Sequence, residues 1–342
     1  MILLSPLGWI YGLVMNMRTA LYDRGWISSH SLGARTISIG NITTGGTGKT
    51  PLVALVAEIL ANNGEKVCIL TRGYGRENPS ARVLVSDGEA ILVDAKTGGD
   101  EPVELASKLL GKAIVVADAD RVAAAKWAME NFEVTAFVLD DGFQHRRAKR
   151  DVDIVCVDAT DPFANGRVLP AGRLREPLRN LRRADAIVVT RADLAKHLDV
   201  LKSQILGIKA GARVFDARNR IANCVALEGL HSKKQSSQST ERFDRPFAFC
   251  GLGNPQNFFD RLLLDSINPV STKTFGDHHS YSAADVRSIE SAAKVVGADS
   301  LITTAKDAVK LTDLKFEIPC YVAELETIID DEKGFRDLVT SS

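Results

Sequence analysis

The sequence predicts a P-loop α/β fold: a mainly parallel, doubly wound sheet with helices on both faces, plus a smaller C-terminal α/β domain. A glycine-rich segment stands between a strand-like run at 36–39 and a helix-like run at 52–60. Short apolar runs then alternate with helical patterns as far as residue 190, which is typical of parallel sheets. A second strand and helix series begins near residue 246. A length of 342 residues suits two domains.

The glycine-rich segment reads Gly-Asn-Ile-Thr-Thr-Gly-Gly-Thr-Gly-Lys-Thr-Pro over residues 40–51. A strand, a glycine loop ending in Gly-Lys-Thr and a helix form a P-loop, whose backbone N–H groups surround phosphates. Lys49 would neutralise the β- and γ-phosphates and Thr50 would hold Mg²⁺. The strict motif has glycine where this chain has Thr43. The expected nucleotide-binding residues are Thr43, Thr44, Gly45, Gly46, Thr47, Gly48, Lys49 and Thr50.

The elements that follow this loop have the lengths of buried strands and their crossover helices. We expect strands at 66–71, 113–117, 134–139, 152–157 and 186–190, a hairpin at 83–93, and helices at about 99–110 and 121–131. Parallel strands place their carboxyl ends at one edge of the sheet, which is where ligands bind in such folds.

The second half of the chain begins with an extended segment at 213–227 and a polar segment at 231–240, and a second series of strands and helices follows. Further strands are expected at 247–250, 270–275, 300–304 and 321–322, with helices at 256–265 and 283–296. The turn at 251–255 is only a fragment of a dinucleotide-binding motif. The predicted organisation is an N-terminal segment at 1–30, a P-loop domain at 31–212, a linker at 213–228 and a C-terminal domain at 229–342.

Composition excludes some classes of protein. Lys and Arg number 43 and so do Asp and Glu, and this zero net charge gives no sign of a nucleic-acid partner. The five cysteines are scattered and form no C-x-x-C pair, so we expect reduced core cysteines and neither a zinc site nor a disulfide framework.

The first 17 residues carry no charged side chain but include Trp9 and Tyr11. They lack the basic start and cleavage site of a signal peptide, and Pro6 and Gly8 weaken a membrane-spanning helix. An interfacial helix, with aromatic residues at the depth of the lipid headgroups, fits better. A helix buried against the protein's own core remains the alternative.

Two acidic pairs are candidates for catalysis. Asp140 and Asp141 end an apolar strand, where a P-loop enzyme organises Mg²⁺, although a surface turn would look the same. Asp100 and Glu101 begin a helix, where Asp100 could cap the helix, serve as the base for an acceptor hydroxyl, or do both. In the second half, His278 could polarise a catalytic carboxylate or touch the γ-phosphate.

In this order, the motifs resemble those of the tetraacyldisaccharide 4′-kinase (lipid A 4′-kinase) family of Gram-negative bacteria. Position 43 is normally threonine in that family, whereas position 305 is more often Glu than the Ala found here. The resemblance covers nearly the whole chain and rests on the uncharged N-terminal segment with Pro6-Leu7 and on the segments at 40–51, 72–75, 99–102, 140–145, 169–176, 277–279 and 304–310.

The resemblance implies Mg²⁺-dependent transfer of phosphate from ATP to the 4′-hydroxyl of a tetraacylated glucosamine disaccharide 1-phosphate, a step of lipid A synthesis. It implies a two-stranded linker and a peripheral protein on the cytoplasmic face of the inner membrane. We expect a monomer. By resemblance Asp100 is the base, supported by His278 from the other domain, and Lys49 is catalytic. Thr50, Glu101, Asp140 and Asp141 would contact the metal or its waters, and Arg72, Tyr74, Arg121 and Arg173 would bind the substrate.

Two alternatives of other classes stay open at this point. A P-loop GTPase is suggested by Thr190-Arg191-Ala192-Asp193, which resembles a guanine-reading turn with arginine in place of lysine. No D-x-x-G motif follows the second acidic strand, which counts against it. The other alternative is a nucleotide-binding protein on the membrane that does no catalysis, although Lys49 and Asp141 are intact.

Overall fold

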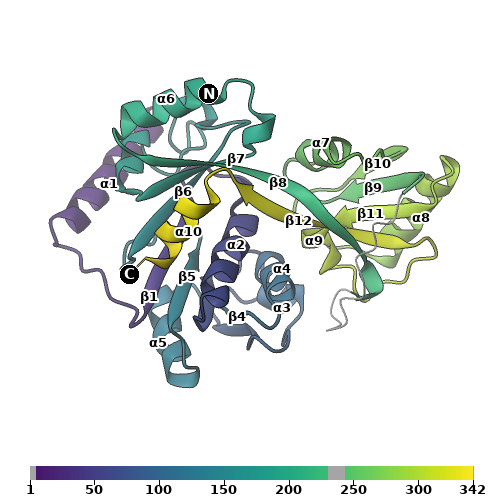
Figure 1. Cartoon of the computed structure of the whole chain (residues 1–342), viewed down its shortest axis with the longest axis horizontal. Coiled ribbons are helices and arrows are strands. Elements are labelled where there is room, and N and C mark those ends of the chain that lie inside the picture. The colour runs from purple at the N-terminus through teal and green to yellow at the C-terminus, as the bar shows by residue number, and fades with distance from the viewer. Residues whose placement is uncertain (1–4, 230–242, 342) are drawn as a thin grey trace. The chain divides into compact units, whose positions relative to one another are not determined.

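The structure, a computed structural model, describes residues 5–229 and 243–341 (Figure 1). The polar segment predicted at 231–240 lies outside the described residues. By its contacts the chain divides into two compact units. Unit 1 comprises residues 1–72, 112–218 and 327–342, and unit 2 comprises 73–111 and 219–326.

This division differs from the predicted boundaries, which placed residues 31–212 in one domain. Residues 73–111 group with the C-terminal half, because helix α4 (Asp100–Lys108) packs against helix α9 (Ala305–Ala308). The side chain of Lys108 also donates a hydrogen bond to the carbonyl of Leu325, at 2.6 Å. The acidic pair at 100–101 therefore belongs to unit 2.

Unit 1 is built on a parallel sheet in the order β8-β7-β6-β1-β5-β2-β4. These strands are buried along nearly their whole length up to β7, as in sheets covered on both faces. The predicted parallel sheet is confirmed. The bounds are β1 Arg35–Asn41, β2 Val67–Thr71, β4 Ala113–Ala117, β5 Ala136–Asp140, β6 Val152–Asp158, β7 Ala186–Thr190 and β8 Arg213–Ala226.

The helices of unit 1 pack on this sheet and on one another. Helix α2 contacts β1, β2 and β5, and α10 packs against α2. Helix α2 begins at Lys49, three residues before the predicted start, because Pro51 fits the first turn of a helix. The bounds are α1 Ser5–Asp23, α2 Lys49–Asn62, α5 Arg121–Asn131, α6 Leu198–Ile208 and α10 Glu332–Thr340.

Unit 2 carries a second parallel sheet, in the order β10-β9-β11-β12. Phe247, Phe249, Leu301 and Val322 from its strands form a buried core. The predicted hairpin at 83–93 is shorter than expected, since its second strand is reduced to an isolated bridge between Ser86 and Ile91. The bounds are β3 Val83–Ser86, α3 Ala95–Gly98, α7 Gln256–Leu264, α8 Ala283–Val295, β9 Pro246–Cys250, β10 Ser271–Thr274, β11 Ser300–Thr304 and β12 Cys320–Ile329.

Two long strands, β8 and β12, run from one unit into the other. The extended segment predicted at 213–227 is β8, whereas β12 is far longer than the two residues predicted for it. Within unit 1, the N–H of Asp216 donates to Asp330 Oδ1 at 2.9 Å. Within unit 2, Arg220 and Glu326 form an ion pair at 2.8 Å.

Candidate active site

The phosphate loop joins β1 to α2 and ends in glycines that only a flexible backbone permits. Gly45 and Gly48 have φ angles of 110° and 72°, which side chains other than glycine rarely adopt. No side chain among the described residues caps the start of α2, so its first N–H groups are available to an anion. A Cβ atom added at Gly46 would meet nothing within 4 Å. This is an open, positively polarised loop of the kind that binds phosphates.

Two neighbouring segments hold the phosphate loop in place from β7 and from residues 173–175. Thr44 N–H donates to the carbonyl of Arg173 at 2.8 Å, and Arg175 N–H donates to that of Ile42 at 2.7 Å. On the other side, the Thr190 hydroxyl donates to the carbonyl of Thr47 at 2.8 Å. The loop is therefore preorganised before any ligand binds.

Threonine side chains inside the loop serve its structure. Asn41 Nδ2 donates to the hydroxyl of Thr47 at 2.9 Å, and both Thr43 and Thr47 are buried. Thr50 is the second residue of α2, the position from which a P-loop hydroxyl reaches Mg²⁺.

Asp140 and Asp141 end β5 in the same unit and have different charge environments. Although burial opposes its charge, Lys49 and Arg175 hold the pKa of Asp141 below its usual range. Their cationic atoms lie 3.2 and 2.6 Å from its two oxygens. Burial, and then the charge of Asp141, raise the pKa of Asp140, which accepts a hydrogen bond from Thr71 at 2.8 Å. Asp141 is thus held in its charged form, whereas a nearby cation would stabilise the charged form of Asp140.

These residues fit Mg²⁺, which prefers oxygen ligands and normally keeps several waters. Two adjacent carboxylates and the Thr50 hydroxyl supply such ligands, and a divalent cation would relieve the unfavourable charge of Asp140. Across the described ranges, no three His, Cys, Asp or Glu side chains cluster as a metal site.

The predicted substrate arginines differ in their surroundings. Arg121 is buried, and its guanidinium donates to the carbonyls of Asp118 and Asp140, at 2.8 and 3.3 Å. Arg173 is half exposed, forms an ion pair with Asp161, and has Nη1 4.0 Å from where a Cβ on Gly45 would stand. Arg121 thus supports the main chain that carries the acidic pair, and Arg173 lies beside the phosphate loop.

The remaining two predicted substrate residues belong to different units. Arg72 follows β2 in unit 1, and Tyr74 belongs to unit 2 with its side chain 63 % exposed. A substrate contact for any of the four residues stays a prediction.

In unit 2 the structure brings Asp100 and His278 together, 178 residues apart in the sequence. Asp100 Oδ2 lies 2.8 Å from His278 Nδ1, and Asp100 Oδ1 accepts the N–H of Glu101 at 3.0 Å. Asp100 is the first residue of α4 and is 6 % exposed. His278 has a φ of 58°, a strained conformation often found at functional sites.

Asp100 and His278 were expected to come from different domains, whereas by its contacts the chain groups both in one unit; the predicted domain boundaries stay a prediction. Both belong to unit 2, because α4 packs with the C-terminal residues. Glu101, next in the chain, lies 3.9 Å from the ammonium of Lys306.

Two charged residues at these sites, Arg175 and Lys310, were not among the predicted site residues. Arg175 pairs with Asp141, and Lys310 lies 3.8 Å from Asp100 Oδ2. Both stand in motifs that carried the resemblance, at 169–176 and 304–310, which was the available signal. Their partners are far away in the sequence, so their contacts were not visible there.

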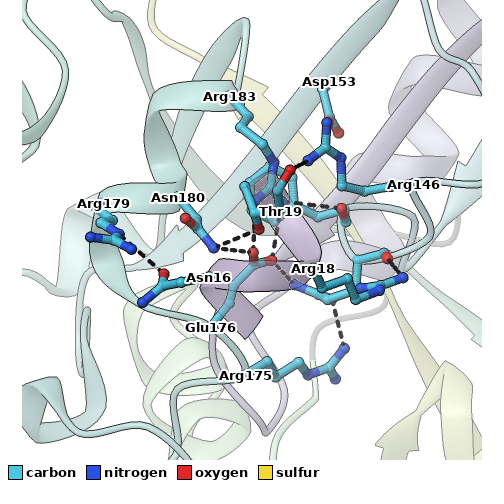
Figure 2. A network of polar contacts seen from close by, with 12 residues as sticks. Asn16, Arg18, Thr19, Arg146, Asp153, Arg175, Glu176, Arg179, Asn180 and Arg183 are labelled. Carbon is cyan, nitrogen blue, oxygen red and sulfur yellow. Dashed lines mark hydrogen bonds and ion pairs between the residues drawn. The ribbon is translucent and has the colours of Figure 1, made fainter. Parts of the chain in front are cut away.

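A network of polar contacts connects helix α1 with the residues that follow Asp141 (Figure 2). Glu176 is 1 % exposed and accepts hydrogen bonds from Gln144, Asn180 and Arg183, at 2.7 to 2.8 Å. From α1, Arg18 donates to the carbonyl of Gln144 at 3.0 Å. The helix is therefore fastened to the loop that follows the acidic pair.

Helix α1 has one packed face and one exposed apolar face. Gly8 and Gly12 lie against Val168 and Ala171, so closely that a Cβ on Gly8 would come 2.9 Å from that of Ala171. The opposite face exposes large apolar side chains, namely Leu7, Trp9, Ile10, Leu13, Val14 and Met17. Within the described residues, none of the helices has the length and apolar character needed to cross a membrane.

The fold of unit 1, with its open phosphate loop, Lys49 and paired carboxylates, defines a P-loop phosphotransferase. Arg191, in the turn that resembled a guanine-reading motif, ion-pairs with Asp158 and donates to the carbonyl of Gly46 at 3.1 Å. That turn thus supports the phosphate loop, and the GTPase alternative gains nothing from it.

Comparisons with known proteins identify the family. The family model described as tetraacyldisaccharide-1-P 4′-kinase matches residues 1–342, and the chain belongs to this family of lipid kinases. The tetraacyldisaccharide 4′-kinase of Geobacter sulfurreducens is 39 % identical over 93 % of this chain and 86 % of its own length. That of Geobacter metallireducens is 37 % identical over 98 % and 96 %.

A solved structure has the same fold over nearly the whole chain. The crystal structure of Aquifex aeolicus LpxK in complex with ATP superposes with a TM-score of 0.79 and 30 % identity. The match covers 98 % of this chain and 97 % of the other.

Proposed function

We propose that this chain transfers the γ-phosphoryl group of ATP to the 4′-hydroxyl of a tetraacylated glucosamine disaccharide 1-phosphate. The product would be the 4′-phosphorylated precursor of lipid A. Support comes from the family match and from one observation in particular, a buried carboxylate, Asp100, paired with His278 at 2.8 Å. A P-loop protein that only bound nucleotide would not need this pair.

Each half of the reaction has its own group of residues. The N–H groups of the phosphate loop and Lys49 would bind the β- and γ-phosphates and stabilise the charge of the transition state. Bound Mg²⁺ would supply further neutralisation of the phosphate oxygens. Thr50, Asp140 and Asp141 would hold it, and Glu101 is a candidate for one of its waters.

Asp100 would accept the proton of the attacking hydroxyl. Its two oxygens each receive one hydrogen bond, from Glu101 N–H and from His278, so each keeps a lone pair for the acceptor. His278 would fix the orientation of the carboxylate and stabilise the charge shared by the pair. Arg72, Tyr74, Arg121 and Arg173 stay candidates for positioning the sugar and its phosphate.

The acceptor is a lipid, and helix α1 offers a means to reach it. We propose that the exposed apolar face of α1 lies in the headgroup region on the cytoplasmic side of the inner membrane. In this arrangement the protein binds peripherally and works as a monomer. Arg18 and Arg24, near the C-terminal end of the helix, suit anionic lipid.

Transfer of label from radiolabelled ATP to tetraacyldisaccharide 1-phosphate in detergent micelles tests the proposal. We expect labelled lipid that depends on Mg²⁺ and that excess GTP barely reduces. A folded protein that binds ATP but labels no lipid would support the non-catalytic alternative and contradict the proposal.

A further inference from the structure

Lys310 carries a buried ammonium group that the proposed reaction does not yet use. It follows α9 in unit 2, and its side chain is 11 % exposed. Its Nζ lies 3.8 Å from Asp100 Oδ2, 3.6 Å from Asp307 Oδ1 and 5.7 Å from the centre of the Tyr281 ring. Among the described residues, Nζ has no hydrogen-bond partner.

Burial of an ammonium group without hydrogen bonds is costly, so its position calls for a reason. Asp307 does not provide that reason. It is fully buried and already accepts hydrogen bonds from Gly251 N–H, the Thr304 hydroxyl and the Tyr281 hydroxyl, at 3.0, 2.7 and 3.0 Å. Both of its oxygens are satisfied without Lys310.

The neighbouring Lys306 shows what an ordinary structural pair looks like at this place. Its ammonium donates to Asp277 Oδ1 at 3.0 Å and lies 3.9 Å from Glu101. The Lys306 ammonium is therefore paired with Asp277 by a direct hydrogen bond, and Glu101 is its second neighbour. Lys310 is the lysine whose ammonium lies beside Asp100 without such a bond.

We propose that Lys310 is a positioning residue for phosphoryl transfer, which holds the Asp100 carboxylate in place by charge while leaving its lone pairs free. The inference rests on the proposed function. A separation of 3.8 Å gives strong Coulomb attraction in a buried site but is too long for a hydrogen bond. The attacking hydroxyl can then donate to an oxygen that a closer lysine would occupy.

The charged groups around Asp100 explain why the single ammonium of Lys310 can hold its carboxylate in place. The other charged or titratable groups near it are Glu101 and Glu104 on α4, His278 and Asp277 on the segment before α8, and Lys306 and Asp307 on α9. Carboxylates outnumber lysines in this set. Without Lys310, Asp307 would face Asp100 with no cation between them, and their repulsion would displace Asp100 from His278.

The test compares steady-state kinetics of full-length variants on tetraacyldisaccharide 1-phosphate and ATP. Lys310→Met keeps the length of the side chain and removes its charge, and Lys310→Arg restores the charge. Lys294→Met is the matched control, because Lys294 pairs with Glu317 on the exposed surface of the same unit. The melting temperature and ATP affinity of each variant are measured as well.

We expect Lys310→Met to lower kcat about 10- to 100-fold with the KM for ATP unchanged, a part of the roughly 10²- to 10⁴-fold that a general base contributes. Lys310→Arg should recover most of the lost kcat, and Lys294→Met should resemble the wild type. A kcat for Lys310→Met within twofold of the wild type would overturn the proposal.

Three other outcomes would also overturn it: a loss expressed only in KM, no recovery by arginine, or a Lys310→Met protein that does not fold. Each would mean that Lys310 serves binding or folding. A wild-type protein that labels no lipid would instead refute the proposed function itself, so the two failures are distinguishable.

Discussion

The exposed apolar face of α1 allows a quantitative prediction about membrane binding. We consider the triple variant Trp9→Gln, Leu13→Gln and Met17→Gln. These residues are spaced by four and so form one stripe of the helix, and their exposed fractions are 80 %, 60 % and 58 %. Glutamine is a good helix former, so the helix itself should persist.

The magnitude follows from the exposed area. A tryptophan of roughly 200 Å², four-fifths exposed, could transfer about 160 Å² from water, worth about 4 kcal/mol at about 25 cal/mol per Å². Leucine and methionine add about 1 to 2 kcal/mol each at these exposures. If about half of this surface enters the headgroup region, the stripe contributes about 3 kcal/mol, or roughly a hundredfold in partitioning.

Co-sedimentation with vesicles that contain anionic phospholipid measures this partitioning. The matched control is Leu263→Gln with Leu264→Gln in α7, two apolar residues that are 53 % and 56 % exposed in unit 2. We expect the triple variant to lose about a hundredfold in partitioning and the control to lose little. Equal binding by the triple variant and the wild type would refute the membrane role of this face.

Four further predictions concern the site and its scaffold. Lys49→Ala should abolish transfer with little change in melting temperature, because Arg175 still pairs with Asp141, and lipid labelling measures this. Asp100→Asn should lower kcat by roughly 10²- to 10⁴-fold with the KM for ATP unchanged. The reason is that Asn can still accept the hydrogen bond from Glu101 N–H but cannot take the proton of the hydroxyl. An unchanged kcat would mean that Asp100 serves only as a helix cap. Chelation of Mg²⁺ by EDTA should stop labelling, and added Mg²⁺ should restore it. Burial raises the pKa of Asp153 to about 6, so the contribution of Asp153 to the unfolding free energy should fall by about 2 to 3 kcal/mol as the pH rises from about 4 to 6, at about 1.4 kcal/mol per pKa unit. Urea unfolding of wild type and Asp153→Asn at both pH values measures this contribution as the difference between the two proteins.

The features that could be predicted from the sequence are those that depend on residues close together in the chain. The phosphate loop needs a run of glycines before Lys49, and a parallel sheet needs short runs of apolar residues, so both are visible locally. The strand end at Asp140 was placed within one residue for the same reason.

What the sequence did not reveal depends on which surfaces pack together. The amphipathic pattern of α4 predicts a helix but does not say that its partner is α9, so the grouping of residues 73–111 with unit 2 was not visible in the sequence. The contact between Asp100 and His278 spans 178 residues. The residues alone offered a catalytic carboxylate as one of two partners for His278, and the resemblance named Asp100 as that carboxylate. Lys310 was overlooked because a lysine near the end of a short helix is ordinarily exposed.

The contacts of unit 1 also show how helix α1 and the phosphate loop can share one support. The Tyr11 hydroxyl of α1 donates to the carbonyl of Arg175 at 2.8 Å. The guanidinium of the same arginine reaches Asp141 at 2.6 Å, and Asp141 in turn lies 3.2 Å from Lys49. Since Arg175 N–H also bonds to Ile42, one residue touches the helix, the acidic pair and the loop. A displacement of α1 would therefore reach Asp141 through Arg175, and it would reach the loop after Asp141 through the hydrogen bond from Arg18 to Gln144.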